Sequence, residues 1–133
     1  MPGGVRTVVH LIARDTGGAF CLFLDEPPYG WSLPAHRHAN EAETIHIVDG
    51  EFEMTIDGAS QRLVAGSTVH IPKGVFHSGA NVGDAAGRRL VIFSPAGMER
   101  FIGQVGSQSP DEGLDQAAVL REAIRHGWEF PRS

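Results

Sequence analysis

Short runs of alternating apolar and polar residues predict a chain built mainly of strands. In the run 51–56, Phe52, Met54 and Ile56 alternate with polar residues, which is the two-residue period of a half-buried strand. The pair Asp57-Gly58 follows, and such a pair favours a two-residue hairpin. Brief strands separated by turn residues predict an all-β fold, an antiparallel sandwich or barrel. The other runs of this kind lie at residues 5–13, 19–26, 43–48, 61–65, 67–72 and 88–94.

The period changes after residue 97, where apolar residues recur at intervals of three and four. A second helix is expected to start at residues 109–112, where Ser, Pro and Glu suit a capped first turn, and to stop at Gly127. The buried stripe of the first helix is predicted to contain Met98, Phe101, Ile102 and Val105. The buried stripe of the second helix is predicted to contain Leu114, Ala117, Leu120 and Ile124.

Neither helix is expected to be stable on its own, because short helices need a surface on which to bury their apolar side. We therefore expect residues 1–96 to form a β barrel and residues 97–133 to form a helical extension packed on it. The length of 133 residues suits one domain with a real core, so both parts are assigned to the same domain.

Charge and composition narrow the classes of function. The formal net charge is −5 at pH 7, and the sequence has no cluster of Lys and Arg, which argues against a nucleic-acid surface. Cys21 is the only cysteine, so no intrachain disulfide can form and a reducing compartment is favoured. No apolar stretch reaches the ~20 residues of a membrane helix, and the first ten residues lack the apolar core of a signal peptide. A cytoplasmic protein that does not contact a membrane is expected.

Two histidines one residue apart are the first candidates for chemistry. On a strand, His36 and His38 project from the same face, which is the geometry that two ligands of one ion need. Glu43 opens the next apolar run, and if it points inward then Ile45 and Ile47 do so too. A carboxylate among aliphatic side chains is costly unless a cation or a proton balances it. A metal ion is the simplest source of that positive charge.

His77 is the candidate for a further ligand, because it follows a Pro-Lys-Gly turn that would begin another strand. Three neutral imidazoles and one carboxylate suit one divalent transition-metal ion (Fe, Mn, Ni, Co, Cu or Zn) rather than calcium or magnesium. Four protein ligands on an octahedral ion leave two positions for water and substrate, whereas a closed tetrahedral zinc site would be structural only. An isolated pair of histidines is more often incidental, so the hypothesis depends on the joint pattern.

The joint pattern resembles the two motifs of the cupin superfamily. In the first motif a glycine is followed after five residues by His-x-His, after four more by Glu and after six more by Gly. In the second motif a glycine is followed after five residues by Pro, after one by Gly, after two by His and after three by Asn. The anchors present in this chain are Gly30, His36, His38, Glu43, Gly50, Gly66, Pro72, Gly74, His77 and Asn81.

The resemblance covers roughly residues 16–127, and the segment after residue 87 is similar to small cupins related to quercetin 2,3-dioxygenase. It implies a jelly-roll barrel of antiparallel strands. It also implies a metal ion held by His36, His38, Glu43 and His77, with Glu43 in the additional catalytic role of proton acceptor.

The same resemblance implies a metal-dependent oxidoreductase of the dioxygenase type that acts on a small organic molecule. Ile45 and His46 stand where the family often has aromatic residues, so a flavonol-sized substrate is not implied. A non-catalytic module that anchors a small ligand on the metal, and a cupin isomerase, remain alternatives. A sensor domain of a transcription regulator is disfavoured, because the sequence has no basic helix-turn-helix segment. Apolar runs at residues 8–12 and 21–24 favour a homodimer.

Other polar residues carry weaker signals. Glu41 could ligate in place of Glu43, but the spacing to Gly50 favours Glu43, so Glu41 is expected at the solvated surface. His46 is expected on the face of its strand that points away from Glu43. Asn81 is expected to be a turn residue rather than a catalytic one.

Overall fold

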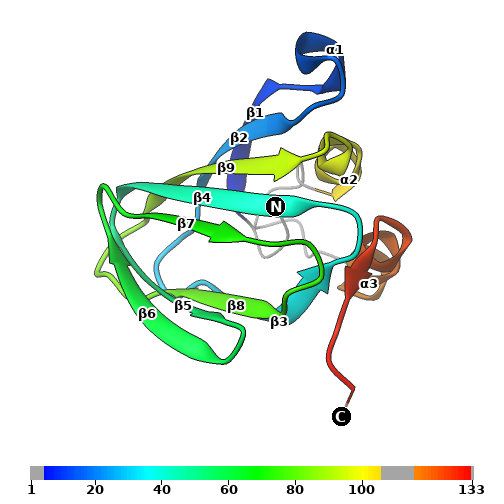
Figure 1. The fold of residues 1–133 in the computed structure, drawn as a ribbon. Coiled ribbons are helices and arrows are strands. Elements are labelled where there is room, and N and C mark those ends of the chain that lie inside the picture. Colours follow the sequence, from blue (N-terminus) through cyan, green and yellow to red (C-terminus); the bar gives the residue numbers. More distant parts are fainter. Residues whose placement is uncertain (1–4, 106–115, 133) are drawn as a thin grey trace.

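The computed structural model describes residues 5–105 and 116–132. Two antiparallel five-stranded sheets face one another in it (Figure 1). The first sheet contains, in order, β1 (Arg6–Leu11), β2 (Cys21–Glu26), β9 (Arg88–Ser94), β4 (Ala42–Asp49) and β7 (Thr68–Ile71). The second contains β10 (Trp128–Glu129), β3 (Ser32–His38), β8 (His77–Asn81), β5 (Glu51–Ile56) and β6 (Ala59–Val64). The prediction of an all-β fold is confirmed.

The hairpin between β5 and β6 forms where the Asp57-Gly58 pair predicted it. Ile56 pairs with Ala59 across a two-residue turn, and φ is 50° at Asp57 and 82° at Gly58. Positive φ at both turn residues gives the turn a twist that matches that of the flanking strands. The turn also fixes the register, because a slip of one residue would move the buried Phe52 to the opposite face of β5.

The hydrophobic core lies between the two sheets, and β4 illustrates how the sequence builds it. Glu43, Ile45 and Ile47 are buried while the residues between them are only half-buried, as the alternation predicted. Phe23 of β2 and Phe93 of β9 are fully buried in the same core, with ring centroids 5.9 Å apart. The inner face of the first sheet is therefore apolar except where polar residues of the site interrupt it.

Within the described residues, three helices accompany the sheets. The run predicted as a strand from residue 5 to residue 13 ends at Leu11, and a single helical turn, α1 (Ala13–Thr16), follows it. The helix predicted after residue 97 is confirmed as α2 (Met98–Val105). The last helix, α3 (Gln116–Arg125), ends just before Gly127, whose φ of 87° suits a left-handed C-terminal cap. Its predicted first turn at residues 109–112, and Leu114, lie outside the described residues.

The predicted buried stripe of α3 is wrong. Leu120 and Ile124 are 46% and 56% exposed, and Ala117 is exposed as well. The side that faces the core carries Ala123, which is buried, and Val119, which packs against the core. Successive residues of an α-helix are ~100° apart, so two neighbouring stripes of this helix are both apolar. The packing of α3 against α2 and β10 determines which of the two stripes is buried, and periodicity alone could not predict it.

A short strand that the sequence pattern did not indicate follows α3. In β10, Trp128 pairs with His38 of β3 and Glu129 pairs with Arg37. Arg37 Nε donates a hydrogen bond of 2.8 Å to Glu129 Oε1 across this pair of strands. The C-terminal segment is thus joined to the strand that carries the two candidate histidines.

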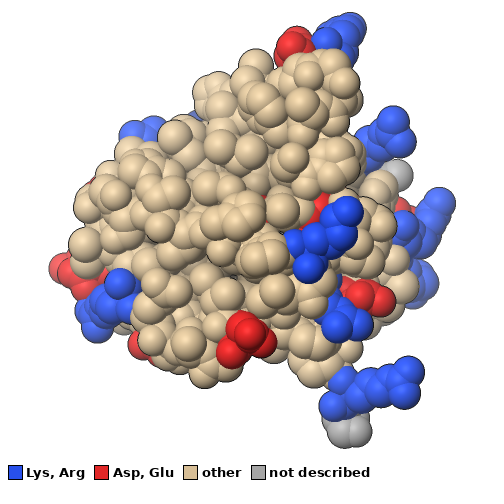
Figure 2. Space-filling view, viewed as in Figure 1, with Lys and Arg blue, Asp and Glu red and all other residues tan. Residues whose placement is uncertain are grey.

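The face of the molecule in Figure 2 is mostly uncharged; most of the charged atoms lie near its edge, and basic atoms also lie over its right-hand part. Val8 and Val9 are exposed on β1, which lies at one edge of the first sheet. Exposed edge strands offer unpaired backbone groups to a second chain. The homodimer expected from these apolar runs stays a prediction. Within residues 5–105 and 116–132, no helix is long and apolar enough to cross a membrane.

Candidate metal centre

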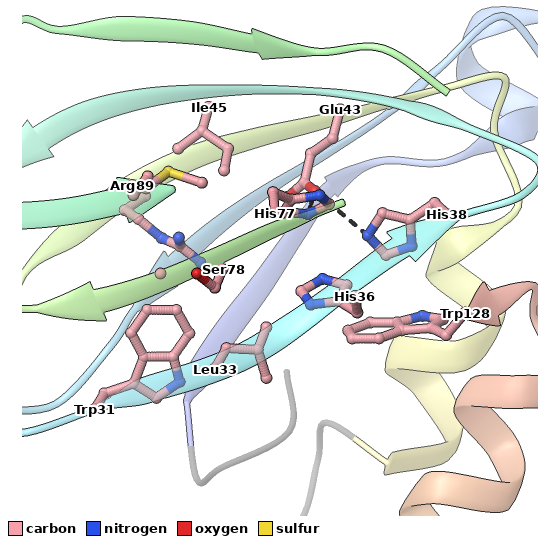
Figure 3. A pocket seen from close by; sticks show the side chains of 12 residues that line it. Trp31, Leu33, His36, His38, Glu43, Ile45, His77, Ser78, Arg89 and Trp128 are labelled. Carbon is pink, nitrogen blue, oxygen red and sulfur yellow. Dashed lines mark ion pairs between the residues drawn. The ribbon is translucent and has the colours of Figure 1, made fainter. Parts of the chain in front are cut away.

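Three strands from the two sheets bring the four predicted ligands into one place. His36 and His38 lie on β3 and point inward together, and His36 pairs with His77 of β8 across the second sheet. Glu43 reaches the same point from β4 of the first sheet (Figure 3). The turn at residues 72–74 therefore leads His77 into the cavity, as the sequence predicted.

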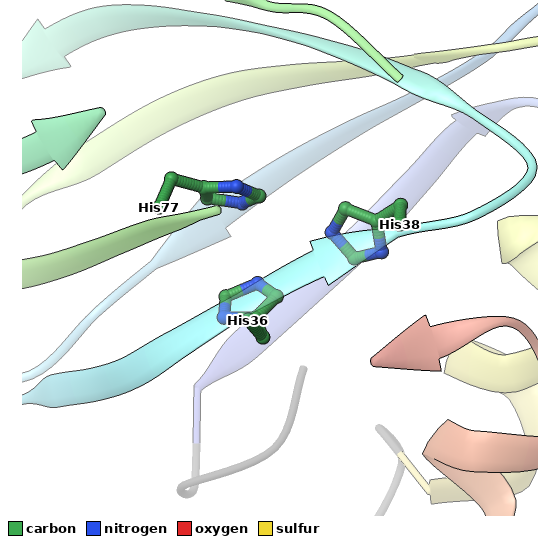
Figure 4. Close-up of side chains that lie close together, drawn as sticks. All are labelled: His36, His38 and His77. Carbon is green, nitrogen blue, oxygen red and sulfur yellow. The ribbon is translucent and has the colours of Figure 1, made fainter. Parts of the chain in front are cut away.

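The four side chains are close together and almost entirely buried. The candidate ligand atoms of His36, His38 and His77 all lie within 4.8 Å of one another (Figure 4). The Oε1 atom of Glu43 is 3.4 Å from His38 Nε2 and 3.2 Å from His77 Nε2. None of the four residues is more than 4% exposed. The atoms that could hold one small ion are therefore those of the three histidines, and Glu43 lies against two of them.

Backbone carbonyls orient two of the imidazoles. His36 Nδ1–H donates to the carbonyl oxygen of Pro34 at 2.8 Å, and His77 Nδ1–H donates to that of Val75 at 3.0 Å. A carbonyl oxygen only accepts, so in each ring the Nδ1 atom carries the hydrogen. The neutral ring then presents the lone pair of Nε2, which is the usual arrangement of a metal-ligating histidine.

Burial and the neighbouring groups set the charges of the cluster. Burial, together with the nearby His77, lowers the pKa of His36 to about 4, so this ring is neutral at pH 7. Burial raises the pKa of Glu43, but the adjacent imidazoles of His38 and His77 lower it more, and the net shift is well below the usual range. Burial lowers the pKa of His77, but Glu43 raises it more, and the net shift is upward. Glu43 is therefore a carboxylate that needs a positive charge beside it.

The residues fit a divalent transition-metal ion. Although two imidazoles lie near it, the buried Oε1 atom of Glu43 makes no hydrogen bond in the described part of the chain. Leaving a buried carboxylate oxygen without a partner is costly, and an ion would supply that partner. Three nitrogen donors and one carboxylate oxygen are a set that first-row transition metals accept readily.

The cavity around these side chains is small. Its volume is about 20 Å³, which is room for an ion or a water molecule but far below that of a drug-sized ligand pocket. Trp31, Arg89 and Trp128 complete much of its wall. A flavonol-sized molecule does not fit in this conformation.

Trp128 is a residue of the site that the sequence did not reveal. Its ring stacks on the imidazole of His36, with centroids 4.5 Å apart and planes at 17°. The same ring meets His38 edge-on, with centroids 4.8 Å apart. Trp128 lies 90 residues beyond His38 in a two-residue strand, and no periodic pattern could have indicated the contact.

The prediction that Glu41 lies at the surface is wrong. It was expected at the solvated surface, yet it is only 7% exposed, and its Oε2 atom is buried without a hydrogen bond within the described ranges. Burial raises the pKa of its carboxyl, although the charges of His38 and Lys73 oppose the shift. Its position just before β4 places it beside the cluster, and residue type alone gave no sign of that burial.

The remaining polar candidates lie away from the cavity. His46 Nδ1 is 2.7 Å from Thr68 Oγ1, a hydrogen bond on the outer face of the first sheet, as its position on β4 predicted. Asn81 was expected in a turn, but it is the last residue of β8. Its amide donates to three backbone carbonyl oxygens while its own oxygen accepts from Gly83 N–H. Asn81 therefore holds loops in place and does not reach the histidines.

Comparison with known proteins identifies the family. Residues 23–93 match the model of the cupin domain. The chain belongs to the cupin family. The jelly-roll fold that the two motifs implied is confirmed.

The curated relatives of this cupin carry different names. Over 109 residues it is 30% identical to polyketide synthase CurC of Streptomyces cyaneus, covering 81% of this chain and 70% of the relative. Over 75 residues it is 37% identical to quercetin 2,3-dioxygenase of Bacillus subtilis, covering 55% of this chain. That aligned region spans only 22% of the dioxygenase.

The similar solved structures support the fold and nothing further. KdgF from Halomonas sp. is similar with a TM-score of 0.65 and 18% identity, over 73% of this chain and 84% of that one. A predicted oxalate decarboxylase from Thermotoga maritima is similar with a TM-score of 0.64 and 24% identity, over 68% and 80% of the two chains.

Proposed function

We propose that this cupin holds one divalent transition-metal ion through His36, His38, His77 and Glu43. We further propose that it is a dioxygenase-type oxidoreductase acting on a small organic molecule. The observation that carries the proposal is the buried Oε1 atom of Glu43, which makes no hydrogen bond within the described residues and lies near the Nε2 atoms of two histidines. The similarity to part of quercetin 2,3-dioxygenase supports the oxidative chemistry.

The protein would contribute geometry, charge and exclusion of water. When bound, the ion supplies Lewis-acid or redox chemistry at the positions that the four side chains leave open. The carbonyl oxygens of Pro34 and Val75 keep the rings of His36 and His77 in the ligating tautomer. Trp128 covers His36 and keeps bulk water from this side of the cavity. Glu43 balances the charge of the ion, and we propose that it also accepts a proton from the substrate.

Purified protein is expected to bind about one transition-metal ion per chain, because the described residues contain one cluster of this kind. Elemental analysis of protein produced without a histidine tag gives the stoichiometry. The matched control is the double variant His36→Ala/His77→Ala, which keeps His38 and Glu43. Equal metal affinity of the double variant and the unchanged protein would reject the site.

Metal affinity is expected to fall as the pH is lowered from about 8 to about 5. An ion and a proton compete for Nε2 of His77, and the pKa of this ring is raised above its ordinary ~6.5. Below that raised pKa one proton must leave for each ion bound, so affinity falls about tenfold per pH unit. His36, with a pKa of about 4, adds a second proton only in stronger acid. Competition with a chelator across this range measures the profile, and a flat profile would contradict the role of His77.

Oxygen consumption tests the oxidoreductase part of the proposal. Protein loaded separately with Fe, Mn, Ni, Co, Cu and Zn should be mixed with small phenolic and enolisable compounds in an oxygen electrode. Turnover with at least one metal is expected, and it should be absent from the His36→Ala/His77→Ala variant. Binding of such compounds without oxygen uptake for any metal would instead support the non-catalytic module.

A further inference from the structure

The cavity at the candidate metal centre is too small to admit a substrate, so part of its wall must move when one binds. Its volume of about 20 Å³ is already that of an ion or a water molecule. Apart from Trp31 and Trp128, every residue that lines it lies on β3, β4, β5, β8 or β9. Each of these strands has a paired neighbour on both sides, so none can move without breaking a ladder of hydrogen bonds. The part of the wall that moves is therefore sought at Trp31 or Trp128.

Trp31 lies at one end of the cavity and is firmly held. The guanidinium carbon of Arg89 is 4.9 Å from its ring centroid, a contact between a cation and an aromatic face. Arg89 is itself fixed by two hydrogen bonds to the buried carboxylate of Asp25. The ring of Trp31 also meets that of Phe52 edge-on, with centroids 6.5 Å apart. This end of the cavity is expected to stay in place.

Trp128 lies at the opposite end of the cavity (Figure 3), on the strand of the wall with the fewest backbone pairs. β10 has two residues, and within the described ranges it pairs with β3 alone and packs against α3. The side chains of Arg37 and Glu129, which form an ion pair across the two strands, are 38% and 48% exposed, so the pair contributes little stability. Gly127 precedes Trp128 with a φ of 87°, and a glycine changes its backbone angles more readily than other residues.

The closed position of Trp128 leaves two buried hydrogen-bonding atoms without partners. Trp128 Nε1 and His38 Nδ1 are both buried, and neither makes a hydrogen bond in the part of the chain that the structure describes. Such atoms are costly away from water, and movement of Trp128 out of the cavity would let both be hydrated. Release of β10 therefore offsets part of the cost of exposing the indole ring.

The space that Trp128 would leave is suited to a flat molecule. The indole is almost parallel to the imidazole of His36, with an angle of 17° between the planes. It also contacts the ring of Phe101, with centroids 5.3 Å apart. A planar ring in the same place would stack on His36 as the indole does and would border the cavity. A non-planar group of the same size would lose that stacking.

We propose that β10 is a gate, and that a planar substrate of about the size of an indole reaches the metal position by displacing Trp128 from His36. The inference rests on the proposed function, because it assumes an ion at the histidine cluster. Without substrate, Trp128 occupies this place and keeps the site closed.

A disulfide across the gate tests the proposal. Arg37 and Glu129 lie opposite one another in an antiparallel pair, so Arg37→Cys/Glu129→Cys places two thiols at a separation that a disulfide can span. The matched control is Thr55→Cys/Ser60→Cys, which cross-links the β5–β6 hairpin of the same sheet at a pair whose hydroxyl oxygens are 2.7 Å apart. Cys21 is fully buried and is not expected to join either cross-link.

Benzimidazole binding to the cobalt(II)-loaded protein, followed by the visible absorption of the cobalt site, is the first readout. The gate disulfide is expected to slow binding about tenfold or more, and its reduction should restore the rate, because closure limits access to the site. The hairpin disulfide should change the rate less than about twofold, since that hairpin does not move in the proposed opening. An equal rate in the oxidised and reduced gate variant, with cross-linking complete, would overturn the gate.

A pair of matched ligands tests the shape of the substrate. In the unchanged protein, 4-phenylimidazole should bind about tenfold more tightly than 4-cyclohexylimidazole, because only the planar ring can stack on His36. Equal affinities would overturn the preference for a planar molecule.

Amide hydrogen exchange in the metal-free protein judges the gate separately from the metal. In the unchanged protein the amides of β10 should exchange about tenfold or more faster than those of β8, because β10 opens locally. The gate disulfide should remove most of this difference, and equal exchange of β10 and β8 in the unchanged protein would overturn the gate. Failure of the unchanged protein to bind cobalt at the histidines would instead overturn the proposed metal site, while the exchange rates would still decide whether β10 opens.

Discussion

Replacing Glu43 with glutamine is expected to reduce turnover about 100-fold or more while the protein keeps a cooperative fold. Glutamine preserves the shape of the side chain but removes the negative charge beside His38 and His77. Metal affinity should fall by more than the roughly 10–100-fold that loss of a supporting contact to a ligand costs. Loss of general-base catalysis alone costs about 10²–10⁴-fold in rate, so activity should stay low when metal is supplied in excess.

Thermal unfolding, metal titration and oxygen uptake on the same Glu43→Gln preparation separate these effects. The matched variant is His38→Ala, which removes a ligand and leaves the carboxylate in place. We expect it to lose metal affinity and to fold normally, because water can enter the emptied position. Full activity of Glu43→Gln with saturating metal would reject the proton-accepting role. Unfolding of His38→Ala would show that the site is structural.

Replacing Trp128 with alanine is expected to lower the free energy of unfolding by about 3 kcal/mol, which is typical for removing a large buried aromatic ring. Trp128 is 3% exposed and contacts the rings of His36, His38 and Phe101. Loss of the stacked ring should also free His36 to rotate, so metal affinity should fall by roughly tenfold. Urea denaturation and metal titration measure the two effects.

Leu120→Ala is the matched control for this variant. Leu120 is a large apolar residue of the same C-terminal segment, but it is 46% exposed on the outer side of α3. Its removal should change the free energy of unfolding by no more than about 0.5 kcal/mol and leave metal affinity unchanged. Equal effects of the two substitutions would mean that β10 does not pack on the site in solution.

Local periodicity was enough to predict the parts of the site that share a strand. His36 and His38 had to point to the same side because a strand repeats every two residues, and Glu43 had to share a face with Ile45. The resemblance of the two glycine-containing motifs to those of cupins then implied that His77 belongs with them. These inferences need no knowledge of how distant strands are arranged.

The parts that could not be predicted depend on contacts between distant segments. Trp128 reaches His36 only because β10 pairs with β3, and a two-residue strand has no periodicity to detect. In the sequence Arg89 is an ordinary polar residue of a predicted strand. Only the structure shows that it pairs with Asp25, 64 residues away. The buried side of α3 was mispredicted for the same reason, because the surface it packs against decides which of two apolar stripes is covered.

The positions of the four candidate ligands have a consequence for the motion of the fold. The three histidines lie in one sheet and Glu43 lies in the other. An ion held by all of them would cross-link the two layers without a covalent bond, so the sheets could not separate locally without losing a ligand. Amide hydrogen exchange in β3, β4 and β8 should therefore slow on metal addition, by up to the ratio of free metal concentration to its Kd. Amides near the tip of the β5–β6 hairpin can open while every ligand stays in place, and their exchange should not change.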